Sequence, residues 1–125
     1  MELPLPGHAS QTNSSLANLE GFRALPAVAA AAMTSHARNR RFAPGEVLFR
    51  EGDESHGIFV VLEGEVRVVR VSRGRQHVLH TEQKGGTLGE VPFFDRKPYP
   101  ATAIAWTAVD TAYLNRSAVS ASIRS

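Results

Sequence analysis

The sequence predicts a mainly β domain, an antiparallel sandwich or barrel with flanking α-helices. From residue 38 onward, short runs rich in β-branched residues alternate with glycine-containing turn signals about every ten residues, which is typical of such folds. The length of 125 residues fits one domain large enough to bury a core. A hydrophobic content of 42% and a charged content of 21% are ordinary for a globular protein.

The N-terminal third predicts a flexible leader followed by helix. Residues 1–15 mix proline, glycine and small polar residues and offer too little apolar surface to order themselves. Residues 16–37 combine large apolar side chains at three-residue spacing with an alanine-rich run, which indicates one or two short helices. Pro26 is expected to divide these helices or to begin the second.

The central part, residues 38–115, is the predicted β-roll. Pro44-Gly45, Gly52-Asp53 and Glu63-Gly64 are turn signals between apolar runs. A final helix is expected to begin at residue 116 and to continue to residue 125. The expected strands are Val47–Phe49, Ile58–Leu62, Val66–Val71, Gln76–Thr81, Ala101–Thr107 and Thr111–Leu114.

Composition excludes several classes of function. With no cysteine, the chain has no disulfide, iron–sulfur cluster, thiolate zinc site or cysteine nucleophile. The longest apolar stretch, Ala24–Met33, is about half the length that a bilayer requires and contains a proline. The N-terminus also lacks the basic region of a secretory signal, so a cytoplasmic protein without membrane contact is predicted.

The basic residues predict no concentrated nucleic-acid surface. The net charge is only +2, and the arginines are spread along the chain. Four of them gather on a predicted hairpin, where a charged strand edge that discourages edge-to-edge pairing is favoured over a nucleic-acid patch. They are Arg67, Arg70, Arg73 and Arg75.

Six short motifs, taken in order, resemble the cyclic-nucleotide-binding domain of the Crp/Fnr (catabolite activator) regulators. They are Pro44-Gly45-Glu46, Glu51-Gly52-Asp53, Phe59–Gly64, Gly85, Gly89-Glu90 and Ala101-Thr102-Ala103. The resemblance implies an eight-stranded, double-sheet jelly-roll β-barrel flanked by helices. It also implies a ligand held inside the roll on a phosphate-binding cassette.

The cassette corresponds to residues 84–94. Its glycines allow the backbone to turn tightly and approach a ligand, and the segment from Gly89 to Val91 opens a short helix whose free N–H groups favour an anion. The resemblance makes Glu90 the acceptor of a ribose hydroxyl. The candidate ligand-binding residues are Gly86, Leu88, Gly89, Glu90, Val91, Tyr99, Pro100, Ala101 and Thr102.

The sequence departs from the family pattern directly before Ala101. Members that bind a cyclic nucleotide carry an arginine and then a serine or threonine there, whereas this chain has Tyr99 and Pro100. Tyrosine carries no positive charge, and proline offers neither a hydroxyl nor an N–H. The two main contacts to a phosphate are therefore absent. Arg96 and Lys97 lie nearby, but the surrounding prolines stiffen the loop against bringing them in. Cyclic AMP and cyclic GMP are therefore not expected to bind in the usual mode, and no cofactor is predicted.

The histidines suggest two alternatives to a cyclic-nucleotide-type sensor domain. His77 and His80, with Glu82 nearby, suggest a metal-dependent enzyme of the cupin type, which shares the jelly-roll plan. Residues three apart on a regular strand face opposite sides, and the cupin His-x-His pattern is absent, so no metal site is predicted. A haem-sensing variant of the same superfamily rests only on the histidines themselves. No serine, histidine and acid combination stands at a spacing that suggests a nucleophile, so no catalytic residue and no enzyme activity is predicted.

The leading hypothesis is a ligand-sensing regulatory domain of a transcription regulator. Its expected partners are a small-molecule effector, a second copy of the full-length protein and, through a further C-terminal domain, DNA. Only nine residues follow Arg116, too few for the dimerisation helix and winged helix that the resemblance implies, so either the natural protein continues after Ser125 or the domain stands alone. The alternative is a ligand-free jelly roll that serves protein interaction or dimerisation.

Overall fold

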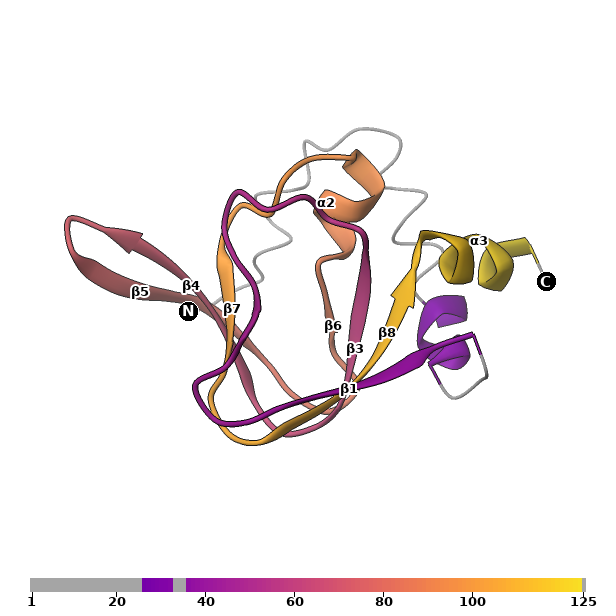
Figure 1. Ribbon diagram of the computed structural model, residues 1–125, viewed down its shortest axis with the longest axis horizontal. Helices are drawn as coiled ribbons and strands as arrows, with labels where there is room; N and C mark the ends of the chain where they lie inside the picture. The colour runs from indigo at the N-terminus through magenta and orange to yellow at the C-terminus, as the bar shows by residue number, and fades with distance from the viewer. Residues whose placement is uncertain (1–25, 33–35, 125) are drawn as a thin grey trace.

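The computed structural model describes residues 26–32 and 36–124, and in it two four-stranded antiparallel sheets face each other (Figure 1). The strand orders are β1-β8-β3-β6 and β2-β7-β4-β5. The predicted leader and the residues 16–25 of the predicted helical region lie outside the described part of the chain. The strands are β1 (Arg38–Phe42), β2 (Val47–Phe49), β3 (Gly57–Glu63), β4 (Val66–Ser72), β5 (Arg75–Glu82), β6 (Thr87–Leu88), β7 (Thr102–Ala105) and β8 (Val109–Asn115).

Three helical segments accompany the sheets: residues 26–31, α2 (Glu90–Asp95) and α3 (Arg116–Arg124). In Figure 1 the first segment and α3 lie together beside β8 and β1, while α2 lies over one end of the roll. The predicted fold class, a double-sheet jelly roll with flanking helices, is thereby confirmed.

Strand β3 separates two hydrophobic cores. Phe59 and Val61 point between the sheets, whereas Ile58 and Val60 point toward the helices, and all four are at most 3% exposed. A strand with apolar neighbours on both faces needs a continuous apolar run instead of alternation. This burial explains the uninterrupted run seen in the sequence.

Two strands were not predicted. The first, β1, has the sequence RNRRF and is largely exposed, and it exists because its backbone pairs with β8 from Arg38 opposite Tyr113 to Phe42 opposite Val109. The second, β6, has only two residues, which pair with Phe59 and Val60 of β3. Neither segment carries an apolar pattern of its own, so each is a strand because its backbone forms hydrogen bonds with a neighbouring strand.

The prediction that His77 and His80 face opposite sides of a strand is wrong. The ladder sets His80 opposite Val68 and His77 opposite Arg70, with a bulge between them. Val68 and Arg70 are two residues apart and share a face, so the two histidines share it as well. Nevertheless, within residues 26–32 and 36–124 no three His, Asp or Glu side chains are grouped as a metal ion would need.

The arginines of the β4–β5 hairpin do not act as one patch. Arg67 lies over the Trp106 ring at 3.8 Å and pairs with Glu65 at 3.0 Å. Arg70 donates instead to the Pro100 carbonyl oxygen, at 2.9 Å from Nη2. Figure 1 shows the hairpin projecting away from the body of the roll.

The described helices include none that is long and apolar enough to cross a bilayer.

Candidate functional site: a pocket under the cassette

A pocket of about 150 Å³ lies between the inner face of the roll and the cassette. Seven of the predicted site residues line it, while Gly86 and Thr102 do not. Gly86 instead receives a hydrogen bond at its carbonyl from Val61 N, and Thr102 accepts one at Oγ1 from Glu51 N, at 2.8 and 3.0 Å. The lining residues are Phe49, Val68, His80, Thr87, Leu88, Gly89, Glu90, Val91, Pro92, Tyr99, Pro100 and Ala101.

Gly89 sets the geometry of the cassette at the start of α2. Its φ of +83° lies in the left-handed region, and its carbonyl accepts the first helical bond from Phe93 N at 3.1 Å. A Cβ on Gly89 would also lie 3.1 Å from Cε1 of Tyr99. Only glycine combines this dihedral with so close an approach to the ring without strain.

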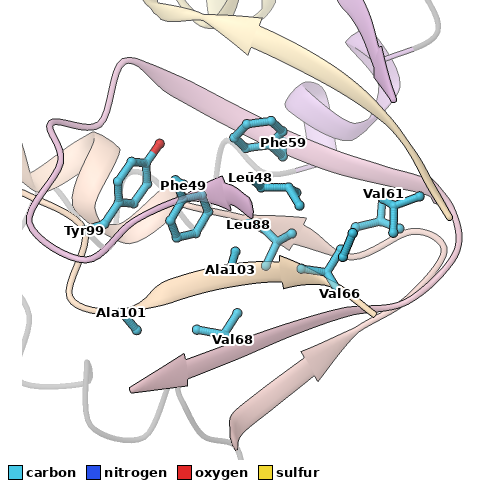
Figure 2. Packing of buried hydrophobic residues seen from close by; sticks show 12 residues of the cluster. Leu48, Phe49, Phe59, Val61, Val66, Val68, Leu88, Tyr99, Ala101 and Ala103 are labelled. Atoms are coloured by element: carbon cyan, nitrogen blue, oxygen red, sulfur yellow. The ribbon is translucent and has the colours of Figure 1, made fainter. Parts of the chain in front are cut away.

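Tyr99 is part of the inner core instead of a flexible pocket rim. Its side chain is only 5% exposed, and its ring stacks on Phe49 with centroids 3.8 Å apart and an interplanar angle of 10° (Figure 2). The backbone is fixed as well, because Tyr99 N donates to Asp53 O and Gly52 N donates to Tyr99 O, both at 2.9 Å. Tyr99 is therefore a fixed part of the pocket wall.

Burial raises the pKa of the Tyr99 phenol, and the nearby Ser55 hydroxyl partly offsets that effect. The phenol thus stays neutral at physiological pH and offers the pocket no charge.

Glu90 is the buried charged residue of the pocket. Its pKa is raised by burial, an effect that hydrogen bonds from its own backbone and from the Thr87 side chain partly offset. Its Oε1 atom is buried and has no hydrogen-bond partner among the described residues. An orphaned buried acceptor is uncommon and unfavourable, so this oxygen is available to a donor that enters the pocket.

Glu82 adds a second carboxyl group beside the first. Burial, and then the negative charge of Glu90, raise its pKa to about 7. Its Oε2 lies 3.6 Å from Nε2 of His80, which itself lines the pocket. A Cβ on Gly86 would lie 2.2 Å from Oε1 of Glu82, which places this carboxyl directly against the cassette.

The pocket has no lysine or arginine among its lining residues in the part of the chain that the structure describes. Arg96 and Lys97, the nearby cations noted in the sequence, line a separate cleft of about 280 Å³ with Glu54, Ser55, His56, Pro98 and Arg116. The stiff segment thus directs its two cations away from the ligand pocket.

Sequence reasoning did not place five of the lining residues in the pocket: Phe49, Val68, His80, Thr87 and Pro92. Thr87 and Pro92 lie within the predicted cassette, next to the candidate residues Leu88 and Val91, so proximity in the sequence was a usable signal. Phe49, Val68 and His80 come from three strands whose meeting depends on the sheet register.

The family model described as "Cyclic nucleotide-binding domain" matches residues 39–125. A cAMP-dependent protein kinase regulatory subunit of Hypocrea atroviridis is 33% identical over 79 residues, which are 63% of this chain and 16% of that protein. A CRP-like cAMP-activated global transcriptional regulator of Mycobacterium tuberculosis is 27% identical over 99 residues, 78% of this chain and 44% of that protein. The chain thus spans less than half the length of either relative.

Solved structures show the same likeness. Thermus thermophilus catabolite activator protein superposes with a TM-score of 0.69 at 27% identity, over 79% of this chain and 46% of that one. The N-terminal domain of a transcriptional regulator from Streptomyces coelicolor A3(2) gives 0.66 at 28% identity, over 82% and 68%. The fold, the cassette and these matches agree, and the chain belongs to the cyclic nucleotide-binding domain family.

Proposed function

We propose that the chain is a ligand-sensing regulatory domain whose pocket does not take cyclic AMP or cyclic GMP in the usual mode of its family. The observation that carries this proposal is the buried Tyr99 ring, stacked on Phe49 at 3.8 Å where a phosphate-binding arginine would stand. Pro100, which follows it, has neither a hydroxyl nor an N–H. A buried phosphate without a cation carries a large desolvation penalty, so a cyclic nucleotide is disfavoured.

A contact between α2 and α3 supports a regulatory role. The Arg116 guanidinium lies over the Phe93 ring at 4.0 Å and donates to the Phe93 carbonyl at 3.3 Å. Because α2 forms the second half of the cassette, a ligand that moves the cassette would also move the start of α3. Such a ligand changes the equilibrium only as far as it binds one arrangement more tightly than the other. In a full-length regulator, α3 would pass this change to a homodimer and to a C-terminal DNA-binding domain.

Calorimetric titration with cyclic AMP and cyclic GMP tests the binding part of this proposal. We expect no saturable heat up to about 1 mM of either nucleotide, which corresponds to less than about 4 kcal/mol of binding free energy. Saturable binding in the micromolar range would contradict the proposal, because Tyr99 and Pro100 would then be compatible with the phosphate.

The double variant Tyr99→Arg, Pro100→Ser restores the residue types that the family uses. We expect it to gain cyclic nucleotide binding if only the phosphate contacts are missing. Val71→Arg is the matched control, because it adds an arginine at a position that is 62% exposed and outside the pocket. Binding gained by both variants would indicate a general charge effect, which would argue against the proposed role of Tyr99.

A second candidate function, a ligand-free dimerisation module, is favoured by two observations. The pocket of about 150 Å³ is smaller than ligand sites usually are, about 300 Å³ or more. In addition, three apolar side chains of the β4–β5 hairpin are exposed: Val71, Val78 and Leu79 at 62%, 50% and 45%. Sedimentation of the chain and of Val71→Thr/Val78→Thr over a range of concentrations tests this function, which predicts a dimer that the variant weakens.

A further inference from the structure

The pocket holds the carboxyl group of Glu90, and its lining residues in the described part of the chain include no lysine or arginine. Glu90 is buried inside it with Oε1 unpartnered among the described residues, and Glu82 lies close enough to feel the charge of Glu90. The nearby basic groups already have partners: Nε2 of His80 lies 3.6 Å from Oε2 of Glu82, and Arg70 donates to the carbonyl of Pro100. The field at Glu90 therefore favours a hydrogen-bond donor with a positive charge.

The remaining walls are apolar and the space is small. Val68, Leu88 and the stacked pair of Phe49 and Tyr99 surround a volume of about 150 Å³. Figure 2 shows these side chains converging from different strands and from the segment that holds Tyr99. An apolar cavity of this volume accommodates a molecule of about the size of benzene.

We propose that the pocket binds a small primary amine, with the ammonium group donating to Oε1 of Glu90 and a compact apolar body against Phe49 and Tyr99. This assignment rests on the proposed function, in that it treats the pocket as the effector site. It goes beyond that function by naming the chemical class of the effector. The ammonium group donates a hydrogen bond to Oε1 of Glu90, which otherwise has no partner among the described residues, and its positive charge balances the negative charge of the ionised carboxylates.

Proton linkage gives the assignment a signature that a neutral ligand lacks. The pKa of Glu82 is about 7, so this group is partly protonated near neutrality, and burial raises the pKa of Glu90 as well. An ammonium ion beside them stabilises their ionised forms, so binding releases protons and becomes tighter as the pH rises from about 5 to 8. The amine itself, with a pKa near 10 like that of lysine, stays charged throughout this range.

Three probes of similar size and different charge test the assignment on the chain as it stands: benzylamine, benzyl alcohol and benzoate. Chemical-shift titration should show benzylamine binding about tenfold more tightly than benzyl alcohol, the difference expected between a charged and a neutral hydrogen bond. Benzoate should bind most weakly. The inference is overturned if benzoate binds as well as benzylamine, or if benzylamine does not saturate by about 10 mM.

The isosteric variant Glu90→Gln locates the interaction. It should lose about tenfold in affinity for benzylamine and leave benzyl alcohol nearly unchanged, because the acceptor remains while its charge is gone. Glu51→Gln, at an exposed position outside the pocket, is the control and should change neither probe. If Glu90→Gln does not fold, calorimetry of the unaltered chain in two buffers of different protonation enthalpy still decides, since absence of proton release would overturn the inference.

A cyclic AMP titration of the same sample separates the two proposals. Saturable binding of cyclic AMP would contradict the proposed function. If cyclic AMP does not bind and benzylamine also fails, only the amine assignment is lost.

Discussion

Two hollows in the described part of the chain lie on either side of one short segment and have opposite chemistry. The pocket under the cassette is apolar and holds the buried carboxyl of Glu90 in about 150 Å³. The cleft beside α3 has about 280 Å³ and contains Arg96, Lys97 and Arg116 against the single acid Glu54. Burial, and then the charge of Arg96, lower the pKa of Arg116, as expected where like charges gather.

Residues 96–99 produce this difference. Arg96 ends α2 in the left-handed region with φ +57°, and Lys97 N donates to Pro92 O at 3.0 Å. The chain then passes Pro98 and turns Tyr99 into the core, where Phe49 and two backbone hydrogen bonds fix it. The sequence therefore contains cations close to the pocket, but the backbone turns them outward. Proximity in sequence is a poor guide to which side chain lines a site.

The largest effect is expected where the pocket wall is also core. Phe49→Ala removes the ring stacked on Tyr99 and leaves a cavity, so the free energy of unfolding should fall by about 3–5 kcal/mol. Arg96→Ala, at the exposed rim of the cleft, should change it by less than about 0.5 kcal/mol. Urea unfolding of both variants measures the contrast, and equal losses would show that the two hollows do not differ in this way.

Gly89→Ala should have the next largest effect. A non-glycine residue at φ +83° loses about 1–3 kcal/mol, and the new Cβ would lie 3.1 Å from the Tyr99 ring. Gly85→Ala is a matched control, because Gly85 has a φ of +92° but no heavy atom within 4 Å of such a Cβ. Thermal unfolding should therefore show a larger loss for Gly89→Ala. Identical losses would mean that the Tyr99 ring can move away from the new Cβ at no cost in stability.

The pH dependence of stability should reveal the acidic pocket. The pKa of Glu82 is about 7 in the folded state and 4.5 as its ordinary value, so the unfolded chain ionises first. The free energy of unfolding should fall as the pH rises from about 4.5 to 7, by about 1 kcal/mol after allowance for solvent screening, and then level off. The pKa of Glu90 is also raised, so its ionisation lowers the free energy of unfolding in the same direction. The basic group next to Glu82 is His80, whose Nε2 lies 3.6 Å from Oε2 of Glu82.

Glu82→Gln should flatten this profile, and chemical denaturation at several pH values measures it. Glu63→Gln, which changes an exposed ion pair with Lys84, serves as the control and should retain the slope. A slope unchanged in Glu82→Gln would contradict the placement of this carboxyl beside Glu90.

The smallest effect is expected in the basic cleft. Arg96→Gln removes a like charge near Arg116, so the variant should gain a few tenths of a kcal/mol at low ionic strength and lose that gain in high salt. Arg75→Gln on the β4–β5 hairpin is the control and should show no such gain. Urea titrations at two salt concentrations measure both, and a loss of stability in Arg96→Gln would show that its charge is already compensated.

The fold was largely predictable because it depends on local patterns that the sequence carries. The apolar run of β3, the turn glycines and the spacing of the cassette each indicate their structure from a few neighbouring residues. The resemblance to the cyclic-nucleotide-binding family predicted seven of the pocket-lining residues. The exposed strand β1 and the two-residue strand β6 escaped, because only backbone pairing with a distant partner makes them strands.

The histidines show where local reasoning fails. Spacing alone predicted opposite faces for His77 and His80. A bulge shifts the register between the pairs Val68–His80 and Val69–Val78, so one extra residue of β5 brings the two histidines to the same face. A bulge changes the side-chain parity of everything beyond it and has no composition signal in this strand. The same register brings His80 to the pocket beside Glu82.

By itself, the sequence determined the jelly-roll fold and the family, and it predicted that Tyr99 and Pro100 stand where the family pattern has its phosphate-binding pair. Only the tertiary structure decided that Tyr99 is a buried core residue, that Arg96 and Lys97 line another cleft, and that Glu82 lies close enough to Glu90 for its charge to raise the pKa of Glu82. The reason is physical: residue types and turns act over a few neighbours, whereas burial and charge proximity arise when strands distant in the sequence pack together.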